Sequence, residues 1–295
     1  MRVVKSRARV RVPATSGNLG PGFDSMGMAH NVWDDVEVRL VAGPTTVTII
    51  GEGQDTLPMD GSHLIVRALR RAFDVAGLPQ AGIEMVCRNS IPQGKGLGSS
   101  AAAVVAGLLL LRGLVDQPEL FDDATVLRLA TEFEGHPDNA APALYGGAVV
   151  CWTDDAPHAA RIHVSPDIHT TLLVPQAELL TETARSVLPT QVPHSDASFN
   201  ASRTALLVLA LERHPELLLA ATDDRLHQAY RADAMPASAN ALQALRKAGW
   251  PTVVSGAGPA LLVFDTLDAQ TCQILEARGF HVVLAGMARG AHLVE

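Results

Sequence analysis

Cysteine and aromatic residues are scarce in this sequence of 295 residues, and hydrophobic runs of membrane-spanning length are missing from it. The three cysteines, Cys87, Cys151 and Cys272, lie far apart and form no C-x-x-C pair. A disulfide framework and a structural zinc site are therefore not expected, and this cysteine usage is typical of the reducing cytoplasm. No apolar run is long enough to span a membrane, and the charged N-terminal residues lack the apolar segment of a signal peptide. We expect a cytoplasmic protein with no membrane partner.

Basic residues are outnumbered by acidic ones, and the formal net charge is −8. This charge argues against nucleic acid as a partner, and it means that local positive groups must attract any anionic substrate. The motifs H-E-x-x-H and G-x-S-x-G are absent, so the sequence carries no signature of a zinc or serine hydrolase. Because 47% of the residues are hydrophobic, we expect a globular chain with one large domain or two smaller ones.

The most informative stretch is rich in glycine and precedes a long apolar run. It consists of Pro92, Gln93, Gly94, Lys95, Gly96, Leu97, Gly98, Ser99, Ser100, Ala101 and Ala102. Glycines let backbone N–H groups approach a ligand closely, and Ser99 or Ser100 is expected to cap the helix that begins there. The start of a helix offers unpaired N–H donors and the positive end of a dipole, both of which suit a phosphate. Lys95 adds a mobile positive charge.

This pattern predicts an anion-binding loop, most simply for a nucleotide. Its spacing matches neither the P-loop G-x-x-x-x-G-K-[ST] nor the dinucleotide-binding motif G-x-G-x-x-G. An ordinary glycine loop with a serine cap is the alternative interpretation of the glycines taken alone.

A second polar cluster follows a helix expected at about 124–134, which Asp122 and Asp123 are suited to start. Glu132 and Glu134 lie in its last turn before Gly135, where the helix dipole disfavours each acid by about 0.3–1 kcal/mol. A solvated surface would tolerate these acids, whereas a bound cation would offset their cost. His136, Asp138 and Asn139 come directly afterwards and add further polar side chains.

Strands are expected at 8–12, 36–40, 46–50, 83–87 and 148–152, and the alternation in the second and third of these favours antiparallel pairing. Residues 13–24 are too rich in glycine and proline to predict helix or strand. Asn18 and Asp24 are the binding candidates in that loop, although Asn and Asp also favour turns. A helix is expected at 62–76, and the helix after the glycine stretch is apolar nearly all round, which predicts a buried central helix.

A domain boundary is expected near 153–157, and strands and helices alternate beyond it. Strands are predicted near 170–174, within 252–264 on both sides of a glycine turn, and at 280–284. Helices are predicted near 182–187, 197–211, 224–231, 239–248 and 268–278. This order indicates a second layer that packs helices on a sheet.

Three stretches resemble, in order and spacing, the three motifs of the GHMP kinases. They are Pro-x-Gly-x-Gly-Leu-Gly-Ser-Ser-Ala-Ala at 92–102, Glu-Gly-His-Pro-Asp-Asn at 134–139 and Ser-Gly-Ala-Gly-Pro at 255–259. Within that superfamily the sequence is most similar to the homoserine kinases, whose N-terminal signature resembles residues 13–24. The segments 183–189, 199–203 and 226–231 also resemble that group.

The resemblance implies an α+β, two-domain GHMP kinase fold, with the active site between the domains. A mixed α+β, ATP-binding domain would span residues 1–155, and a ferredoxin-like domain would span 156–295. The implied cofactors are ATP and Mg²⁺. The implied reaction phosphorylates the side-chain hydroxyl of L-homoserine to O-phospho-L-homoserine, a step towards threonine.

The resemblance also implies roles for individual residues. Residues 92–102 would hold the ATP phosphates, and Mg²⁺ would be bound by Ser100 (or Ser99) with Glu134 (or Glu132). The substrate would be oriented by Asn18, Asp24, His136, Asp138, Asn139 and Gly256, and its carboxylate would be held by Arg185 and Arg231. Lys95, Asp138 and Asn139 are the catalytic candidates.

Three alternatives remain open on the sequence. One is a GHMP kinase for a sugar or an isoprenoid alcohol such as mevalonate, although two arginines argue against a neutral sugar. Another is a relative that binds nucleotide without catalysis, against which the intact glycine stretch and Glu134 argue. A third is a decarboxylase of the same fold. The sequence does not indicate an oligomeric state, for which a homodimer is the commonest default.

Overall fold

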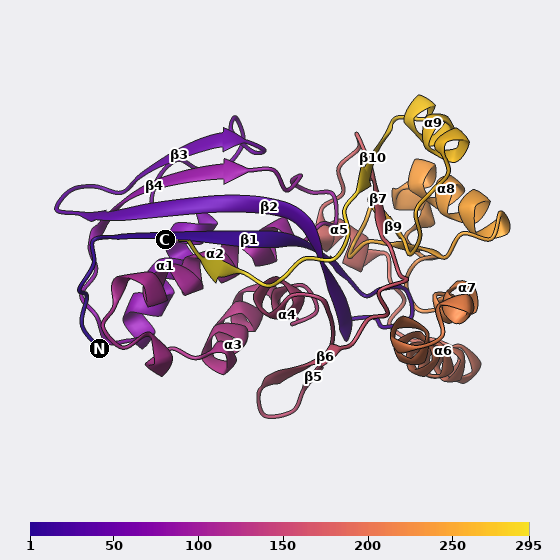
Figure 1. Ribbon diagram of the computed structural model, residues 1–295, viewed down its shortest axis with the longest axis horizontal. Helices are drawn as coiled ribbons and strands as arrows, with labels where there is room; N and C mark the ends of the chain where they lie inside the picture. Colours follow the sequence, from indigo (N-terminus) through magenta and orange to yellow (C-terminus); the bar gives the residue numbers. More distant parts are fainter. Residues whose placement is uncertain (295) are drawn as a thin grey trace.

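Two β-sheets organise the chain, and the computed structural model describes residues 1–294 (Figure 1). The first sheet has seven strands: β1 (Arg7–Gly17), β2 (Met26–Val41), β3 (Thr46–Gly51), β4 (Gly82–Asn89), β5 (Ala148–Thr153), β6 (Pro157–Ile162) and β11 (His292–Leu293). The second has four strands: β7 (Thr171–Pro175), β8 (Thr252–Val254), β9 (Leu261–Val263) and β10 (Phe280–Leu284).

The helices of the first half lie on one side of the large sheet (Figure 1). They are α1 (Leu64–Val75), α2 (Ser99–Leu114), α3 (Asp123–Glu134) and α4 (Ala140–Tyr145). The second half contains α5 (Thr181–Ser186), α6 (His194–Glu212), α7 (Leu218–Ala221), α8 (Pro236–Lys247) and α9 (Ala269–Ala277). None of the helices within residues 1–294 combines the length and hydrophobicity that a membrane crossing requires.

The first sheet is only partly the antiparallel sheet that the alternation at 36–40 and 46–50 predicts. The neighbours of β2 include β1 and β4, whereas β3 pairs only with β4 and runs parallel to it. The reason is the connection: α1 lies between β3 and β4 in the sequence, and such a helical crossover returns the chain in a parallel direction. Strand alternation alone carries no information about this partner choice.

The segment 13–24 is also partly regular, contrary to the expectation of a loop. Strand β1 continues through Gly17, and its pairing with β2 shifts register between Pro13 and Ala14. A proline is tolerated there because a bulge does not require its missing N–H donor. Only residues 18–25 connect the strands, and Asn18 and Asp24 have positive φ angles of 67° and 54° in this connection. Non-glycine residues with such angles are uncommon and concentrate at functional sites.

Helix α2 is the buried central helix that the sequence predicts. Eleven of its 16 residues are buried, so surrounding side chains hold the helix along its length. The expected serine cap is wrong, however. The N-cap residue is Gly98, with φ 67° and ψ 25°, and no side chain caps the helix. Ser99 and Ser100 lie inside the first turn, because the left-handed conformation at Gly98 starts the helix one residue earlier.

The second domain has the order strand, helices, two strands, helix, strand, and its sheet has the order β10-β7-β9-β8 with antiparallel neighbours. This is the ferredoxin-like arrangement. Leu261 and Val263 of β9 pack with residues of α8 and α9, whereas Leu262 faces the opposite way, into the core shared with the first domain. The shared core fixes the two sheets relative to each other.

The strands also bear on where the domains divide. Residue 155 falls in the turn of the β5–β6 hairpin, and both of its strands belong to the first sheet. Near the C-terminus, β11 returns to the first sheet and pairs with β1. We therefore propose that the first domain comprises residues 1–162 together with the C-terminal segment that carries β11.

The expected helices at 62–76, 124–134, 182–187, 197–211, 239–248 and 268–278 are found as α1, α3, α5, α6, α8 and α9. The helix expected at 224–231 is wrong, because these residues form a series of turns. The Asp224 carboxylate accepts hydrogen bonds from the N–H groups of Leu226, His227 and Gln228. A side chain that takes up consecutive backbone donors in this way competes with regular helix geometry.

Candidate active site

A cavity of about 350 Å³ lies where the two domains meet. Its walls contain most of the residues singled out in the sequence, drawn from segments far apart in the chain. These are Asn18, Asp24, Gly94, Gly96, Gly98, Ser99, Ser100, Glu134, His136, Asp138, Asn139, Arg185, Arg231 and Gly256. Phe133, Leu179, Leu180, Thr181 and Ala257 complete the lining.

The start of α2 forms one wall of this cavity. Gly98 approaches Thr15 so closely that an added Cβ would overlap the Thr15 hydroxyl oxygen. The N–H of Ala102 bonds to the Gly98 carbonyl, so the preceding N–H groups, from Ser99 to Ala101, have no partner within the helix. Unpaired donors at the positive end of a long buried helix form an anion-binding surface.

Ser100 and Glu134 meet at this wall. The Ser100 hydroxyl donates to Glu134 Oε1 at 2.6 Å. Burial raises the pKa of the Glu134 carboxyl, and the Ser100 hydrogen bond opposes that rise. Glu132 points elsewhere, because its carboxylate pairs with Arg71 and Arg128 at the surface. The end of α3 therefore presents Glu134, and not Glu132, to the cavity.

A buried carboxylate organises the neighbouring wall. Asp138 is 1% exposed, and it accepts hydrogen bonds from the His136 ring, from the backbone N–H of Asn18 and from the side chain of Asn139. Burial lowers the pKa of His136, but its hydrogen bond with Asp138 and the Asp138 charge outweigh that effect, and the net shift is upward. Asn139 also accepts from the Thr15 hydroxyl at 2.9 Å, so this cluster is joined to the start of α2.

The connection between β1 and β2 forms the next part of the site. Asn18 Oδ1 accepts from the backbone N–H of Asp24 at 2.9 Å, and Asn18 Nδ2 donates to the Gly256 carbonyl at 2.8 Å. Asn18 therefore holds the turn that presents Asp24. The Asp24 carboxylate faces Arg185 of α5, which donates to both of its oxygens.

Arg231 is the largest fully buried side chain of the described chain, at 2% exposed. It donates to the carbonyls of Ala184 and Gly256, at 3.2 and 3.0 Å. Burial lowers its pKa to about 10, which leaves it charged at neutral pH. Phe23 lies close to both cations, with its ring centroid 5.8 Å from Arg231 Cζ and 5.6 Å from Arg185 Cζ. Aromatic rings attract cations at such distances.

The glycine-containing turn at 255–259 joins the domains at the glycine stretch. The Ser255 hydroxyl donates to the Gly96 carbonyl at 2.7 Å, and the N–H of Gly256 donates to the Gly17 carbonyl at 3.1 Å. An added Cβ at Gly96 would overlap the Ser255 carbonyl oxygen. The third sequence motif therefore supports the anion-binding loop from the second domain.

Not every residue of 92–102 faces the cavity. Leu97, Ala101 and Ala102 are buried in the hydrophobic core. Lys95 does not supply the free charge expected of it, because its ammonium donates to the carbonyls of Gln176 and Ala177 and lies 3.8 Å from Glu178. These acceptors belong to the segment that leads to α5, and they hold Lys95 outside the cavity lining.

A smaller cavity of about 200 Å³ adjoins the first turn of α2, and Ser99 and Ser100 line both cavities. Its remaining lining residues are Asp34, Leu57, Pro58, Ser62, His63, Leu64, Ile65, Asn89, Gln93 and Ala103. His63 Nδ1 accepts from the N–H of Ile65, which places the ring hydrogen on Nε2. His63 Nε2 and Asn89 Oδ1 are buried without a hydrogen-bond partner in residues 1–294.

Sequence reasoning did not single out Phe23, Thr15 or Thr181. Phe23 and Thr15 lie in the N-terminal segment 13–24, where Asn18 and Asp24 drew attention because their side chains are polar. Thr15 contacts Gly98, and Phe23 lies beside Arg185 and Arg231. Contacts between segments so distant in sequence cannot be predicted from a local pattern.

A two-domain fold with an anion-binding helix start, a buried carboxylate beside it and a cavity between the domains is the arrangement of the GHMP kinase class. The family models agree: "GHMP kinases N terminal domain" matches residues 63–147 and "GHMP kinases C terminal" matches residues 205–273.

Individual proteins similar to this chain identify the particular family within the GHMP kinase class. A homoserine kinase of Streptomyces coelicolor is 52% identical over 91% of this chain and 87% of its own length. One of Mycobacterium tuberculosis is 48% identical over 92% and 89%. The crystal structure of homoserine kinase from Cytophaga hutchinsonii superposes with a TM-score of 0.87 at 27% identity, covering 100% of this chain and 99% of that one. The chain belongs to the homoserine kinase family.

Proposed function

We propose that this protein transfers the γ-phosphoryl group of ATP to the side-chain hydroxyl of L-homoserine, which yields O-phospho-L-homoserine on the route to threonine. ATP use follows from membership of a kinase family. The observation that carries the proposal is that one cavity contains both the Ser100–Glu134 pair and the charged set formed by Asp24, Arg185 and Arg231. The first set suits a nucleotide phosphate with its metal, and the second suits an amino acid.

The phosphates would lie against the start of α2. The N–H groups of its first turn have no partner within the helix, and they would stabilise negative charge without any rearrangement during the reaction. The base would occupy the smaller cavity, where His63 Nε2–H and Asn89 Oδ1 offer an unused donor and an unused acceptor. Ser99 and Ser100 line both cavities, so one nucleotide can reach from the second cavity into the first.

Ser100 and Glu134 fit a magnesium ion. A hydroxyl and a carboxylate oxygen 2.6 Å apart are ligands of the oxygen type that Mg²⁺ prefers, and Mg²⁺ commonly uses few protein ligands beside phosphates and water. When bound, the ion would neutralise charge on the phosphate oxygens. The raised pKa of Glu134 fits a carboxyl that is buried close to the place where a cation is expected.

Homoserine would bind between the cations and acids of the same cavity. Its carboxylate would face Arg185 and Arg231, and its ammonium would face Asp24. Asp138 and Asn139, which lie between Asn18 and Thr15 in the hydrogen-bond network, would orient the hydroxyl towards the phosphates. Because phosphoryl transfer depends mainly on positioning and charge stabilisation, a rigid network of this kind provides much of what the reaction requires.

Lys95 has a different role in this proposal from the catalytic one expected on the sequence. Its ammonium ties the glycine stretch to the segment before α5, so it aligns the phosphate-binding wall with the segment that carries Arg185. The three free cysteines support a cytoplasmic location for this activity.

The test is an ADP-release assay with homoserine, mevalonate and galactose as acceptors. We expect ADP release to depend on homoserine, with phosphate recovered on its hydroxyl. Equal or greater activity with mevalonate or galactose would favour another GHMP kinase, and release of carbon dioxide would favour a decarboxylase. ATP binding without turnover on any acceptor would favour a non-catalytic relative.

A further inference from the structure

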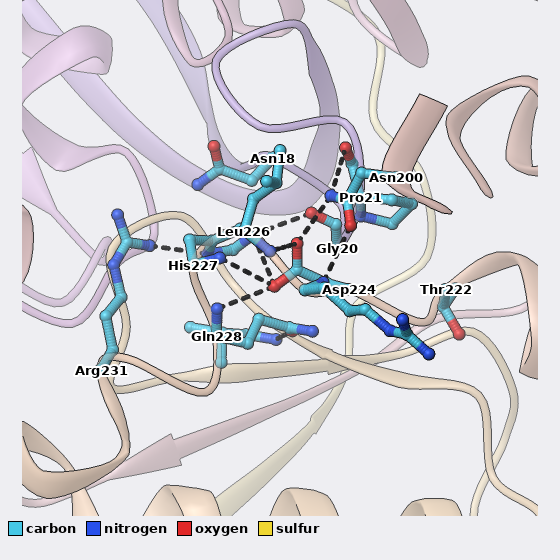
Figure 2. Close-up of polar contacts among 12 residues, drawn as sticks. Asn18, Gly20, Pro21, Asn200, Thr222, Asp224, Leu226, His227, Gln228 and Arg231 are labelled. Atoms are coloured by element: carbon cyan, nitrogen blue, oxygen red, sulfur yellow. Dashed lines mark hydrogen bonds and ion pairs between the residues drawn. The ribbon is translucent and has the colours of Figure 1, made fainter. Parts of the chain in front are cut away.

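The segment from Asp224 to Arg231 is held by an extensive side-chain network (Figure 2). The Asp224 carboxylate accepts from the backbone N–H groups of Leu226, His227 and Gln228, at 3.0, 3.1 and 2.8 Å, and from Asn200 Nδ2 at 2.9 Å. The side chains of Asp224 and His227 are fully buried. This network fixes the backbone from which His227 projects.

The hydrogen bonds of His227 determine which ring nitrogen carries the hydrogen. His227 Nε2 lies 2.8 Å from the carbonyl oxygen of Gly20. A carbonyl can only accept, so the hydrogen is on Nε2. Nδ1 lies 3.1 Å from Arg231 Nη1, and because a guanidinium can only donate, Nδ1 must be bare. Burial lowers the pKa of His227 against the opposing charge of Asp224, which agrees with a neutral ring.

His227 is the one side chain that accepts from Arg231 within residues 1–294. The other acceptors are the backbone carbonyls of Ala184 and Gly256, and Arg231 Nη2 has no hydrogen-bond partner there. Arg231 also lines the main cavity. The guanidinium is therefore held by hydrogen bonds from Nε and Nη1, and Nη2 is the nitrogen left to bind a ligand.

We propose that His227 is a positioning residue for substrate recognition: its bare Nδ1 orients the Arg231 guanidinium so that Nη2 meets the carboxylate of the amino acid. This inference rests on the proposed function. His227 also links the domains, because its Nε2–H bonds to Gly20 in the β1–β2 connection that carries Asp24. The His227 ring therefore contacts both Arg231, which is proposed to bind the carboxylate, and the β1–β2 connection, whose Asp24 is proposed to bind the ammonium.

Two substitutions at His227 test the contributions of the two ring nitrogens separately. The side-chain oxygen of Asn reaches roughly the position of Nδ1, so His227→Asn retains an acceptor for Arg231 and loses the bond to Gly20. The terminal amide nitrogen of Gln reaches roughly the position of Nε2, so His227→Gln retains the donor to Gly20 and removes the acceptor. Both variants lose the ring contact with Phe23, whose centroid lies 5.2 Å from that of His227, which makes them matched controls for packing.

We expect His227→Gln to raise the KM for homoserine by roughly tenfold to a hundredfold, the range for losing a hydrogen bond to a charged group. His227→Asn should raise it clearly less, and the KM for ATP should change little in either variant. In an Arg231→Leu background the two substitutions should have equal effects on the KM for homoserine. The variants differ in whether they keep an acceptor for Arg231, and that difference no longer matters once the arginine is absent. Thermal unfolding of each variant reports losses of stability separately.

The results that overturn the inference are distinct from those that overturn the function. A wild type inactive on homoserine would overturn the proposed function and this inference with it. An active wild type, with equal KM values for homoserine in the Asn and Gln variants, would overturn the inference alone. Nitrogen NMR of the wild type gives a check that needs no variant: a proton on Nδ1 of His227 at neutral pH would overturn the inference, and a proton on Nε2 alone supports it.

Discussion

Arg185 and Asp24 form a two-point ion pair across the domain junction, with Nη1 donating to Oδ2 at 3.2 Å and Nη2 to Oδ1 at 2.6 Å. Both side chains are only about one third exposed, at 38% and 34%. Under the proposed function, Arg185 binds the carboxylate of homoserine and Asp24 binds its ammonium. Substrate binding would therefore replace this one ion pair by two ion pairs with the substrate. The protein thereby keeps the two charges compensated before substrate arrives.

We expect Arg185→Leu and Arg231→Leu each to raise the KM for homoserine by about thirtyfold or more, because losing one charged hydrogen-bonding partner of the substrate in a desolvated site commonly costs ~2–5 kcal/mol. The KM for ATP should remain nearly unchanged. Arg231→Leu should also lower the thermal midpoint, because Arg231 donates to two backbone carbonyls inside the protein.

The control for this prediction is the amino alcohol left when homoserine loses its carboxylate. It should be a poor substrate of the wild type and should suffer little further loss in either variant. Equal losses with both acceptors would show that the arginines support the fold and do not recognise the carboxylate.

Glu134→Ala should abolish most of kcat and weaken the dependence of the rate on Mg²⁺, since Glu134 is paired with Ser100 at the start of α2. Glu132→Ala is the matched control: it removes an acid two residues away that pairs with Arg71 and Arg128 at the surface, where such pairs contribute about 0–1 kcal/mol. Magnesium titrations of the rate compare the two variants. The same titration curve for Glu134→Ala and wild type would refute the metal assignment.

Gly98→Ala should weaken ATP binding and also destabilise the protein. The new Cβ would overlap the Thr15 hydroxyl, and φ of 67° is a conformation that alanine adopts at a cost. Gly77→Ala is the matched control, because Gly77 has a similar φ of 64° but no atom near its added Cβ. That variant should lose only about 1–2 kcal/mol of stability and retain its ATP affinity.

Calorimetric titration with ATP and urea unfolding measure both quantities for the two glycine variants. Wild-type ATP affinity in Gly98→Ala would exclude the start of α2 as the phosphate site. Equal unfolding free energies for the two variants would show that the close approach to Thr15 adds no cost beyond backbone strain.

Asp34 provides a prediction on pH. Burial raises its pKa from 3.8 to about 7, against hydrogen bonds from the backbone N–H groups of Ile91 and Ser90. Between these two values the folded state binds a proton that the unfolded state has released. The stability that this protonation contributes is complete below the unfolded pKa and is lost as the pH rises through the folded pKa, by up to about 1.4 kcal/mol per pH unit.

Asp34→Asn cannot lose that proton, so it should gain stability relative to the wild type as the pH rises from about 5 to about 8. Urea unfolding across this range measures the difference. Asp35→Asn, at the next position of β2, controls for the loss of one negative charge. A difference between Asp34→Asn and wild type that stays constant with pH would contradict the prediction.

Local patterns in the sequence were sufficient for many elements and for the outline of the site. The sequence predicted α1, α3, α6 and α9, and the all-round apolar character of α2 predicted its burial, because these signals depend on neighbouring residues along one element. Part of the glycine stretch, and Glu134 of the two acids at the end of α3, do line one cavity, since helix ends carry partial charges whatever the surrounding fold.

The tertiary structure decided matters that depend on distant segments. Asn200 of α6 donates to the Asp224 carboxylate, which also takes up the N–H groups of the following residues, so a segment predicted to be helical folds as turns. The crossover through α1 makes β3 parallel to β4. Lys95 turns towards the carbonyls of residues 176 and 177 and away from the cavity, a choice that its own neighbours in the sequence do not encode.

The same division applies to recognition of the substrate. Sequence alone identified Arg185 and Arg231 as cations and Asp24 as an acid, because charge is a property of the residue. That Arg185 pairs with Asp24, and that His227 bonds to Gly20, follows from a fold that brings residues 161 and 207 positions apart into hydrogen-bond contact. Burial makes these contacts important for stability, since a buried polar group without a hydrogen-bond partner costs far more free energy than an exposed one.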